Sequence, residues 1–174
     1  MRSPNFDGKY LGYYYVAGEF KFKPNADNWE GDWGQKKGAS KGTLVQDDEE
    51  NCSADGNGFY QFNVDLGAMT YSLSPVTSIS IIGTVNGNWD TDTDLTYNVE
   101  TGAWETTAAL SAGLMKFRMN HDWAISWGGN GSSTAYDNLT QYNGDNLEVT
   151  EAATYKVQLF LSCEGQHKVV LTKQ

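Results

Sequence analysis

Apolar and polar residues alternate with a period of two along several short segments of the chain. In residues 154–161, every second position from Tyr155 to Leu161 is apolar, and Lys156 and Gln158 stand between them. Successive side chains of a β-strand point to opposite faces, so this pattern predicts a half-buried strand. Similar segments are separated by Gly, Asn and Asp clusters, and long runs of helical period are missing. The pattern predicts an all-β protein built from antiparallel β-sandwiches. In the second half of the chain the expected strands lie near residues 78–84, 103–110, 114–120, 147–150, 154–162 and 167–172.

The alternating pattern occurs twice in the chain. Residues 21–23 (Lys-Phe-Lys) recur as residues 116–118 (Lys-Phe-Arg), an offset of 95 residues (116 − 21). Residues 59–66 align with residues 154–161 at the same offset. An internal repeat of this length indicates two similar modules. Further matching positions are Asn25 and Asn120, Trp29 and Trp123, and Trp33 and Trp127.

The repeat predicts a partial module in residues 1–75 and a complete one in residues 76–174. Only residues 1–20 precede the Lys-Phe-Lys segment of the first module, whereas about forty residues precede its counterpart in the second. We therefore expect the first module to lack its N-terminal strands. An unpaired sheet edge would then be exposed there, and association or disorder would follow.

Composition and charge exclude several classes of protein. The chain has 12 basic and 22 acidic side chains and a net charge of −10, and its only close basic group outside the strand-like segments is Lys36, Lys37 and Lys41. Nucleic acid is therefore not an expected partner. No segment approaches the about 18 apolar residues of a membrane span. Cys52 and Cys163 do not match in the repeat, so a disulfide between them is not expected.

The Lys-Phe-Arg segment indicates the chemistry of a candidate site. Period-two geometry places Lys116, Arg118 and Asn120 on one face of a strand and Phe117 and Met119 on the other. Two tryptophans follow in residues 121–131, a Gly-rich segment that we expect to be irregular.

These residue types suit a neutral sugar. Indole rings stack on its C–H face, while cationic and amide side chains engage its hydroxyls. Trp104 is a further candidate wall, because Thr106 and Ala108 would leave its face of the strand open. Against this stands a structural interpretation: a Trp in a small β-sandwich is more often core, and a basic row is often only a solvated face. The candidate carbohydrate-binding residues are Trp104, Lys116, Arg118, Asn120, Trp123 and Trp127 in the second module and Lys21, Lys23, Trp29 and Trp33 in the first.

Other chemistries have weaker support. Residues 90–94 (Asp-Thr-Asp-Thr-Asp) are similar to the start of a calcium loop, but Leu95 stands where the glycine belongs, so a polar turn after Trp89 is expected instead. The two histidines lie in different contexts, and neither a metal site nor a cofactor is expected. Glycoside hydrolysis needs a pair of carboxylates, and only Asp32 and Asp122 lie near the repeated residues, at positions that are not equivalent. We therefore expect no enzymatic activity.

An ordered series of residues in the chain carries a family resemblance: Gly83, Trp89, Asp90, Asp94, Leu95, Trp104, residues 116–118, Asn120, Asp122, Trp123, residues 127–129, residues 145–147 and Tyr155. This series resembles the C-terminal modules of SusE/SusF-type surface glycan-binding lipoproteins. The similarity covers residues 78–174 almost completely and residues 8–74 in part. It implies immunoglobulin-like β-sandwich modules that hold starch or a related α-glucan at the outer face of an outer membrane, beside a transporter complex. It further implies that Trp104, Lys116, Arg118 and Trp123 or Trp127 contact the sugar, with Lys21, Lys23, Trp29 and Trp33 in the first module.

The chain departs from this family in one further respect. No cysteine that could carry a lipid stands near residue 1, so the anchor of the native protein is expected outside this chain. Two rival functions stay open: an accessory carbohydrate-binding region of a glycoside hydrolase, and a structural or docking module of a surface complex.

Overall fold

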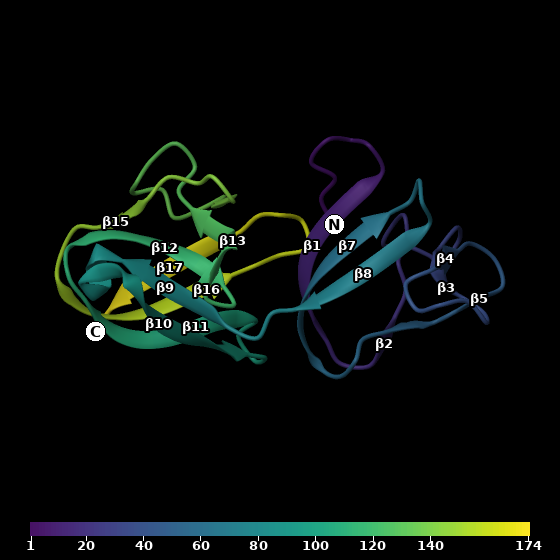
Figure 1. Cartoon of the computed structure of the whole chain (residues 1–174), viewed down its shortest axis with the longest axis horizontal. Coiled ribbons are helices and arrows are strands. Elements are labelled where there is room, and N and C mark those ends of the chain that lie inside the picture. The colour runs from purple at the N-terminus through teal and green to yellow at the C-terminus, as the bar shows by residue number, and fades with distance from the viewer. The chain divides into compact units, whose positions relative to one another are not determined.

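The computed structural model describes residues 1–174, which form two compact units, Met1–Pro75 and Val76–Gln174 (Figure 1). This division falls where the sequence repeat places the module boundary. Every regular element is an antiparallel strand apart from one short 3₁₀ turn, Thr84–Asn86, so the predicted all-β fold class is confirmed. The chain has no helix with the length and apolarity of a membrane span. Neither Cys52 nor Cys163 is in a disulfide.

The second unit contains one antiparallel sheet of nine strands. Their order is β14-β13-β12-β9-β10-β11-β16-β17, and β15 also pairs with β12. The strands are β9 (Ile79–Gly83), β10 (Asn88–Asn98), β11 (Ala103–Leu110), β12 (Gly113–Met119), β13 (Asp122–Gly128), β14 (Thr140–Gln141), β15 (Leu147–Val149), β16 (Ala153–Phe160) and β17 (Lys168–Lys173).

Strand β10 is the point at which this sheet curls. Residues 93–95 pair with β9, and residues 96–98 pair with β11, so a single strand belongs to both halves of the sheet (Figure 1). The inward side chains of the curled sheet are apolar and fully buried. Among those with no exposed surface are Ile79, Ile81, Met115, Phe117, Trp127, Val157 and Leu159.

The sequence missed two long strands of this unit, β10 and β13, and the two-residue strand β14. Residues 88–98, read in part as a polar turn, form β10, and most of residues 121–131, expected to be irregular, form β13. Both strands carry polar or exposed residues along much of their length, so hydrophobic alternation is weak. In β10 only Leu95 is buried. Its acidic side chains find partners on neighbouring strands, which sequence alternation alone does not reveal.

The first unit contains three small antiparallel sheets. Strand β1 (Lys9–Val16) pairs with β7 (Gly58–Asp65), and β7 pairs with β8 (Thr70–Pro75). The other sheets are β2 (Glu19–Phe20) with β6 (Cys52–Ser53), and β3 (Gly34–Lys36) with β4 (Leu44–Val45) and β5 (Glu49–Glu50). A core of buried residues lies among them, with Leu44, Cys52, Val64 and Tyr71 in one cluster and Val16, Tyr60 and Phe62 in another.

The strand pairings of the first unit repeat those of the second. The β1-β7-β8 sheet corresponds to β11-β16-β17, because Tyr14 pairs with Tyr60 as Ala108 pairs with Tyr155. The pair Phe20–Cys52 recurs as Met115–Leu147, each at the offset of 95 residues. No strand of the first unit corresponds to β9 or β10. The repeat therefore extends to tertiary pairing, and the first unit lacks the counterparts of these two strands.

A close backbone approach also recurs. A Cβ atom added at Gly34 would lie 2.3 Å from the carbonyl oxygen of Glu50, and one added at Gly128 would lie 2.2 Å from that of Asp145. Backbone oxygens cannot move away as a flexible side chain can, so only glycine fits at either position.

We predict that Gly34→Ala lowers the free energy of unfolding of the first unit by about 1–3 kcal/mol, because the added methyl group overpacks a fixed backbone. Chemical denaturation followed by residue-resolved hydrogen exchange measures this. Gly67→Ala is the matched control, since its nearest neighbour is the end of the Asp65 side chain at 3.3 Å. Equal losses for the two variants would contradict the prediction.

Candidate functional site

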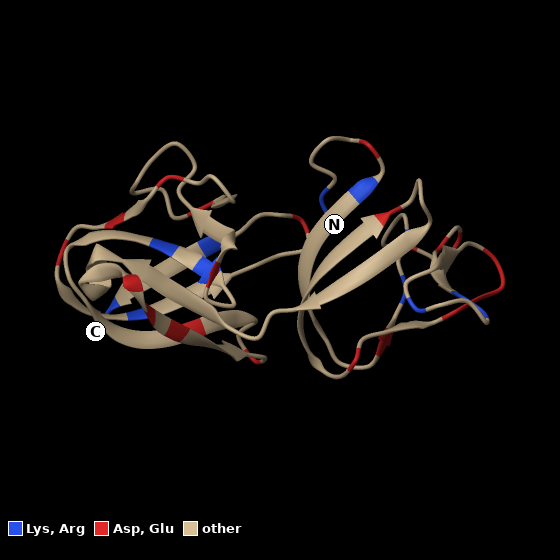
Figure 2. Cartoon of the chain, viewed as in Figure 1, with Lys and Arg blue, Asp and Glu red and all other residues tan.

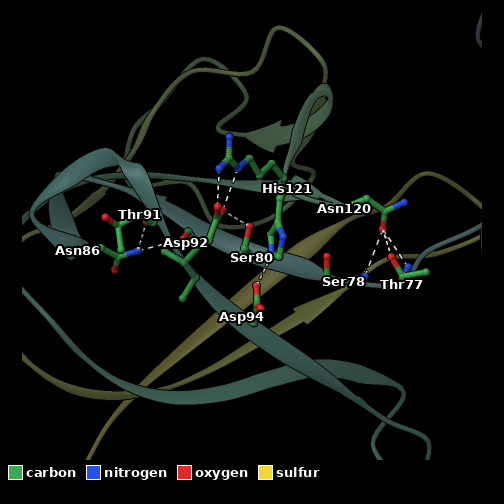
Figure 3. Close-up of polar contacts among 11 residues, drawn as sticks. Thr77, Ser78, Ser80, Asn86, Thr91, Asp92, Asp94, Asn120 and His121 are labelled. Carbon is green, nitrogen blue, oxygen red and sulfur yellow. Dashed lines mark hydrogen bonds and ion pairs between the residues drawn. The ribbon is translucent and has the colours of Figure 1, made fainter.

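An ion pair lies on the outward face of the sheet in the second unit. The Arg118 Nε donates a hydrogen bond to Asp92 Oδ1 at 2.8 Å, and its Nη2 donates to Asp92 Oδ2. The Ser80 hydroxyl donates to the same carboxylate, as the dashed lines in Figure 3 show. Strand pairing creates this contact, because Arg118 on β12 lies opposite Ser80 on β9. The carboxylate of Asp92 thus holds the guanidinium in a fixed orientation.

The electrostatics of this pair are mutual. Hydrogen bonds from the Arg118 guanidinium, with a smaller contribution from Ser80, hold the pKa of Asp92 below its usual value. The Asp92 carboxylate in turn raises the pKa of Arg118. Both side chains are mostly buried, with 11% of Arg118 and 18% of Asp92 exposed. The pair is therefore ionised at neutral pH.

One indole ring lies beside the guanidinium, and a second indole lies against the first. The Arg118 Cζ lies 5.1 Å from the centroid of the Trp123 ring, within the range of a cation–π contact. The ring of Trp89 in turn contacts the Trp123 indole, with ring centroids 6.2 Å apart and planes inclined by 42°. Trp123 is 47% exposed, and Trp89 is half-buried. These two indoles, with Arg118, are called the indole face below.

A second carboxylate binds the histidine of the same region. His121 Nε2 lies 2.6 Å from Asp94 Oδ1, and Figure 3 shows the imidazole directed at this carboxylate. Both side chains are about half exposed. Both basic and acidic residues occur among the strands of the second unit (Figure 2). The indole face thus lies in a region of mixed charge.

The predicted faces of β12 are confirmed, but the two cations on its outward face differ. Met115 and Phe117 point inward and have no exposed surface, while Lys116 and Arg118 lie on the opposite face. Arg118 is held by Asp92. Lys116 is half-buried and makes no ion pair, so its ammonium group is available to a ligand. The interpretation of Arg118 as a freely exposed donor is therefore wrong.

Two of the predicted sugar-stacking residues are core residues. Trp104 is 5% exposed and Trp127 is fully buried. Trp104 pairs in register with Leu159, and directly opposed residues of an antiparallel pair point to the same face, here the core. Trp127 pairs with Phe117 and therefore points inward with it. The prediction for both tryptophans is wrong, because period two groups residues by face without telling which face is inward.

Asn120 has a structural role at the end of β12. It follows the end of β12 with a φ of 53°, which removes it from the period of the strand. Its Oδ1 accepts hydrogen bonds from the backbone N–H groups of Thr77 at 2.9 Å and Ser78 at 3.2 Å, and from the Thr77 hydroxyl (Figure 3). Asn120 therefore anchors the segment that leads into β9 through its Oδ1, and a contact of this exposed residue with sugar stays a prediction.

The first unit shows a comparable cation over an indole. The Lys23 Nζ lies 4.6 Å from the centroid of the Trp29 ring and donates to the carbonyl of Ala26 at 2.9 Å. Trp29 is 62% exposed. Lys23 and Trp29 are the repeat counterparts of Arg118 and Trp123, so the same pair of groups meets in both units. The sequence singled out both pairs, and the structure brings each together.

The remaining predicted residues of the first unit have structural contacts. Lys21 forms ion pairs with Asp32 at 3.1 Å and with Glu49, and these carboxylates raise its pKa. Trp33 is half-buried and packs against the core cluster around Leu44, as its counterpart Trp127 does in the second unit. Lys21 and Trp33 therefore contribute to the fold through these contacts, and their contact with a sugar stays a prediction.

Sequence reasoning missed Trp89, Asp92 and Ser80 as parts of this site. Trp89 and Asp92 lie in the segment that was expected to contain a turn, and a turn gives no reason to align side chains with a neighbouring strand. A signal was present in the spacing of Asp90, Asp92 and Asp94, which period two places on one face. An acidic row of this kind favours nearby basic groups, and the structure places Arg118 against Asp92 and His121 against Asp94.

Part of the first unit matches a known protein family. Residues 5–75 match a family described as a domain of unknown function, DUF8037, which lies within the first unit. No curated protein matches the chain. The second unit, which carries the indole face, lies outside the matched residues.

The Asp92–Arg118 pair predicts how the stability of the second unit depends on pH. The pKa of Asp92 is lower in the folded protein, so its contribution to stability is complete above the unfolded value of about 4 and is lost as the pH falls through the folded value. We expect Asp92→Asn to lower the free energy of unfolding by about 1–3 kcal/mol at pH 7, since it leaves Arg118 without its charged partner. The loss should shrink as the pH falls below about 4, the unfolded value. Urea unfolding across this range measures it, and a loss independent of pH would contradict the assignment.

Proposed function

We propose that the second unit binds a neutral glycan, without catalysis, on the indole face. A pyranose stacks on the exposed part of the two indoles, and its hydroxyls engage Lys116 and the guanidinium of Arg118. The Asp92 carboxylate holds the guanidinium in place, which reduces the side-chain entropy lost on binding. Exposure supports the choice of residues, because Trp123 is 47% exposed whereas Trp104 and Trp127 are core.

The observation that carries this proposal is the recurrence of an exposed indole beneath a cation at equivalent positions of the two units. The distances are 4.6 Å for Lys23 and Trp29 and 5.1 Å for Arg118 and Trp123. Core packing does not explain these exposed tryptophans, because the core position of each repeat is already filled by Trp33 or Trp127. The cation covers one side of the ring and leaves the rest of the indole to a ligand.

Charge favours a neutral ligand over an anionic one. The acidic residues Asp90, Asp92 and Asp122 all act on the Arg118 guanidinium. The chain as a whole has a net charge of −10. A uronic acid or sulfated sugar would therefore meet repulsion, whereas the hydroxyls of a neutral sugar find both donors and acceptors.

The inclination of the indoles favours a curved glycan. A β-1,4-linked glucan presents successive rings in a nearly flat ribbon, while an α-1,4-linked glucan turns from ring to ring. The planes of Trp89 and Trp123 are inclined by 42°. We therefore propose a starch-like α-glucan as the ligand, and a member of a cell-surface glycan-uptake system with immunoglobulin-like modules as the protein. A lipid anchor in the outer membrane and association with a transporter complex are parts of the same proposal.

A second candidate function is a structural or docking module. It is favoured by the burial of Trp104 and Trp127 and by the hydrogen bonds of Asn120 to the β9 segment, which serve the fold alone. A third candidate, an accessory region of a glycoside hydrolase, uses the same indole face and differs in what accompanies it.

We predict that maltoheptaose binds the full chain and that Trp123→Ala raises the dissociation constant about tenfold or more, because a stacking anchor is lost. Trp89→Ala should have a similar effect. Isothermal titration calorimetry with maltoheptaose and with cellohexaose separates the α-linked from the β-linked ligand, and the cellohexaose heat should be much the smaller.

Val99→Ala is the matched control, since Val99 is an exposed apolar residue, at 60%, that has no part in the indole face. Its affinity should equal that of the unsubstituted chain. An absence of binding heat with either glycan, or an equal loss in the Val99 and Trp123 variants, would overturn the proposal and leave the docking module as the better interpretation.

A further inference from the structure

In the second unit, β9 and β10 close two sheet edges. Residues 79–83 of β9 pair along residues 115–119 of β12, and residues 96–98 of β10 pair with residues 103–105 of β11. Together they cover the core side chains of β12. Met115 and Phe117 consequently have no exposed surface.

The same two edges of the first unit have no such partners. The counterparts of residues 103–105 are residues 9–11 of β1, where the only pairing on the outer edge is a single bridge between Leu11 and Arg2. The counterparts of Met115 and Phe117 are Phe20 and Phe22, which are both partly exposed. Unpaired edges of this kind are templates for another strand.

Residues 1–3 fill part of this position, and they fit it poorly. Met1 packs against both core clusters of the unit, beside Phe20 and Phe22. Arg2 and Leu11 exchange two backbone hydrogen bonds, at 3.1 and 2.9 Å. The Ser3 hydroxyl is buried without any hydrogen-bond partner, which costs free energy that a matched strand would not incur.

Charge on the same face points to the chemistry of the missing partner. Arg118 in the second unit is bound by Asp92, a β10 residue. Its counterpart Lys23 has no carboxylate and donates instead to the carbonyl of Ala26. A strand in the position of β10 would therefore place an acidic side chain against Lys23.

We propose that the first unit binds a β-hairpin of the β9–β10 type, which displaces residues 1–3. Its first strand pairs along residues 20–23 and carries β-branched apolar side chains that cover Phe20 and Phe22, as Ile79 and Ile81 do in the second unit. Its second strand pairs with residues 9–11 and carries an acidic residue for Lys23. The two backbone hydrogen bonds to Arg2 are exchanged for a ladder on both edges. This proposal does not depend on the proposed function, because it concerns a different unit and a backbone interface.

The test uses the full chain and a synthetic peptide with the sequence of residues 76–98, which includes both strands. Hydrogen exchange followed by mass spectrometry should show amides 9–11 and 20–23 slowed about tenfold or more at saturating peptide, because they join a ladder. Native mass spectrometry should give one peptide per chain. The matched control is a peptide carrying Ile79→Asp and Ile81→Asp, which places charges against the core and should not bind.

A charge exchange tests the register. Lys23→Glu in the chain should weaken binding of the unsubstituted peptide. A peptide carrying Asp92→Lys should bind the Lys23→Glu variant and not the unsubstituted chain. Protection of β11 and β12 instead of the first unit, or protection that rises with chain concentration in the absence of peptide, would overturn the proposal. The second of these outcomes would identify another copy of the chain as the occupant. Unchanged exchange at residues 9–11 and 20–23 would also refute it.

Discussion

The opposed faces of a single strand connect the core of the second unit to its candidate site. On β12, Phe117 points inward and has no exposed surface, and the next residue, Arg118, points outward to Asp92. Any slip of one residue in the pairing of β12 with β9 would exchange these two side chains and bury a charge in the core. The register that fills the core therefore also delivers the guanidinium to Asp92 and Trp123. The site depends on the fold through this one constraint.

The two units show what happens when the same repeat is completed to different extents. The sheet β1-β7-β8 follows the pairing of β11-β16-β17, and Gly34 and Gly128 meet an equivalent carbonyl oxygen in each unit. The first unit does this without counterparts of β9 and β10. Its cores are rich in aromatic residues, with Phe20, Phe22, Phe62 and Tyr71 in edge-on contacts at centroid distances of 5.3 to 6.3 Å. Large rings cover area that the missing strands cover in the second unit, which explains how a partial module can keep a core.

Hydrophobic alternation in the sequence predicts the buried face of some strands and fails for others. Residues 154–161 alternate clearly, and the structure buries Val157, Leu159 and Leu161 as expected. The alternation of β10 is carried by acids and threonines, so hydrophobic pattern gave no strand there, and with it Trp89 and Asp92 were missed. Trp104 and Trp127 were assigned to the wrong face, because a large aromatic residue serves a core and a sugar equally well. The pairing of Trp104 with Leu159 decides between these roles, and it joins residues that are far apart in sequence.

By itself the sequence determined the all-β class, the repeat and the alternation of β12, because these depend on the order of residues within one segment. It also determined that a cation and an indole recur together, as Lys23 with Trp29 and Arg118 with Trp123. The tertiary structure decided which face of each strand is inward, that Asp92 holds Arg118, and that Trp89 joins Trp123. These contacts arise between β9, β10, β12 and β13, whose side chains meet only after the backbone ladder has fixed their register. Local pattern sets which residues share a face, and long-range pairing sets what that face meets.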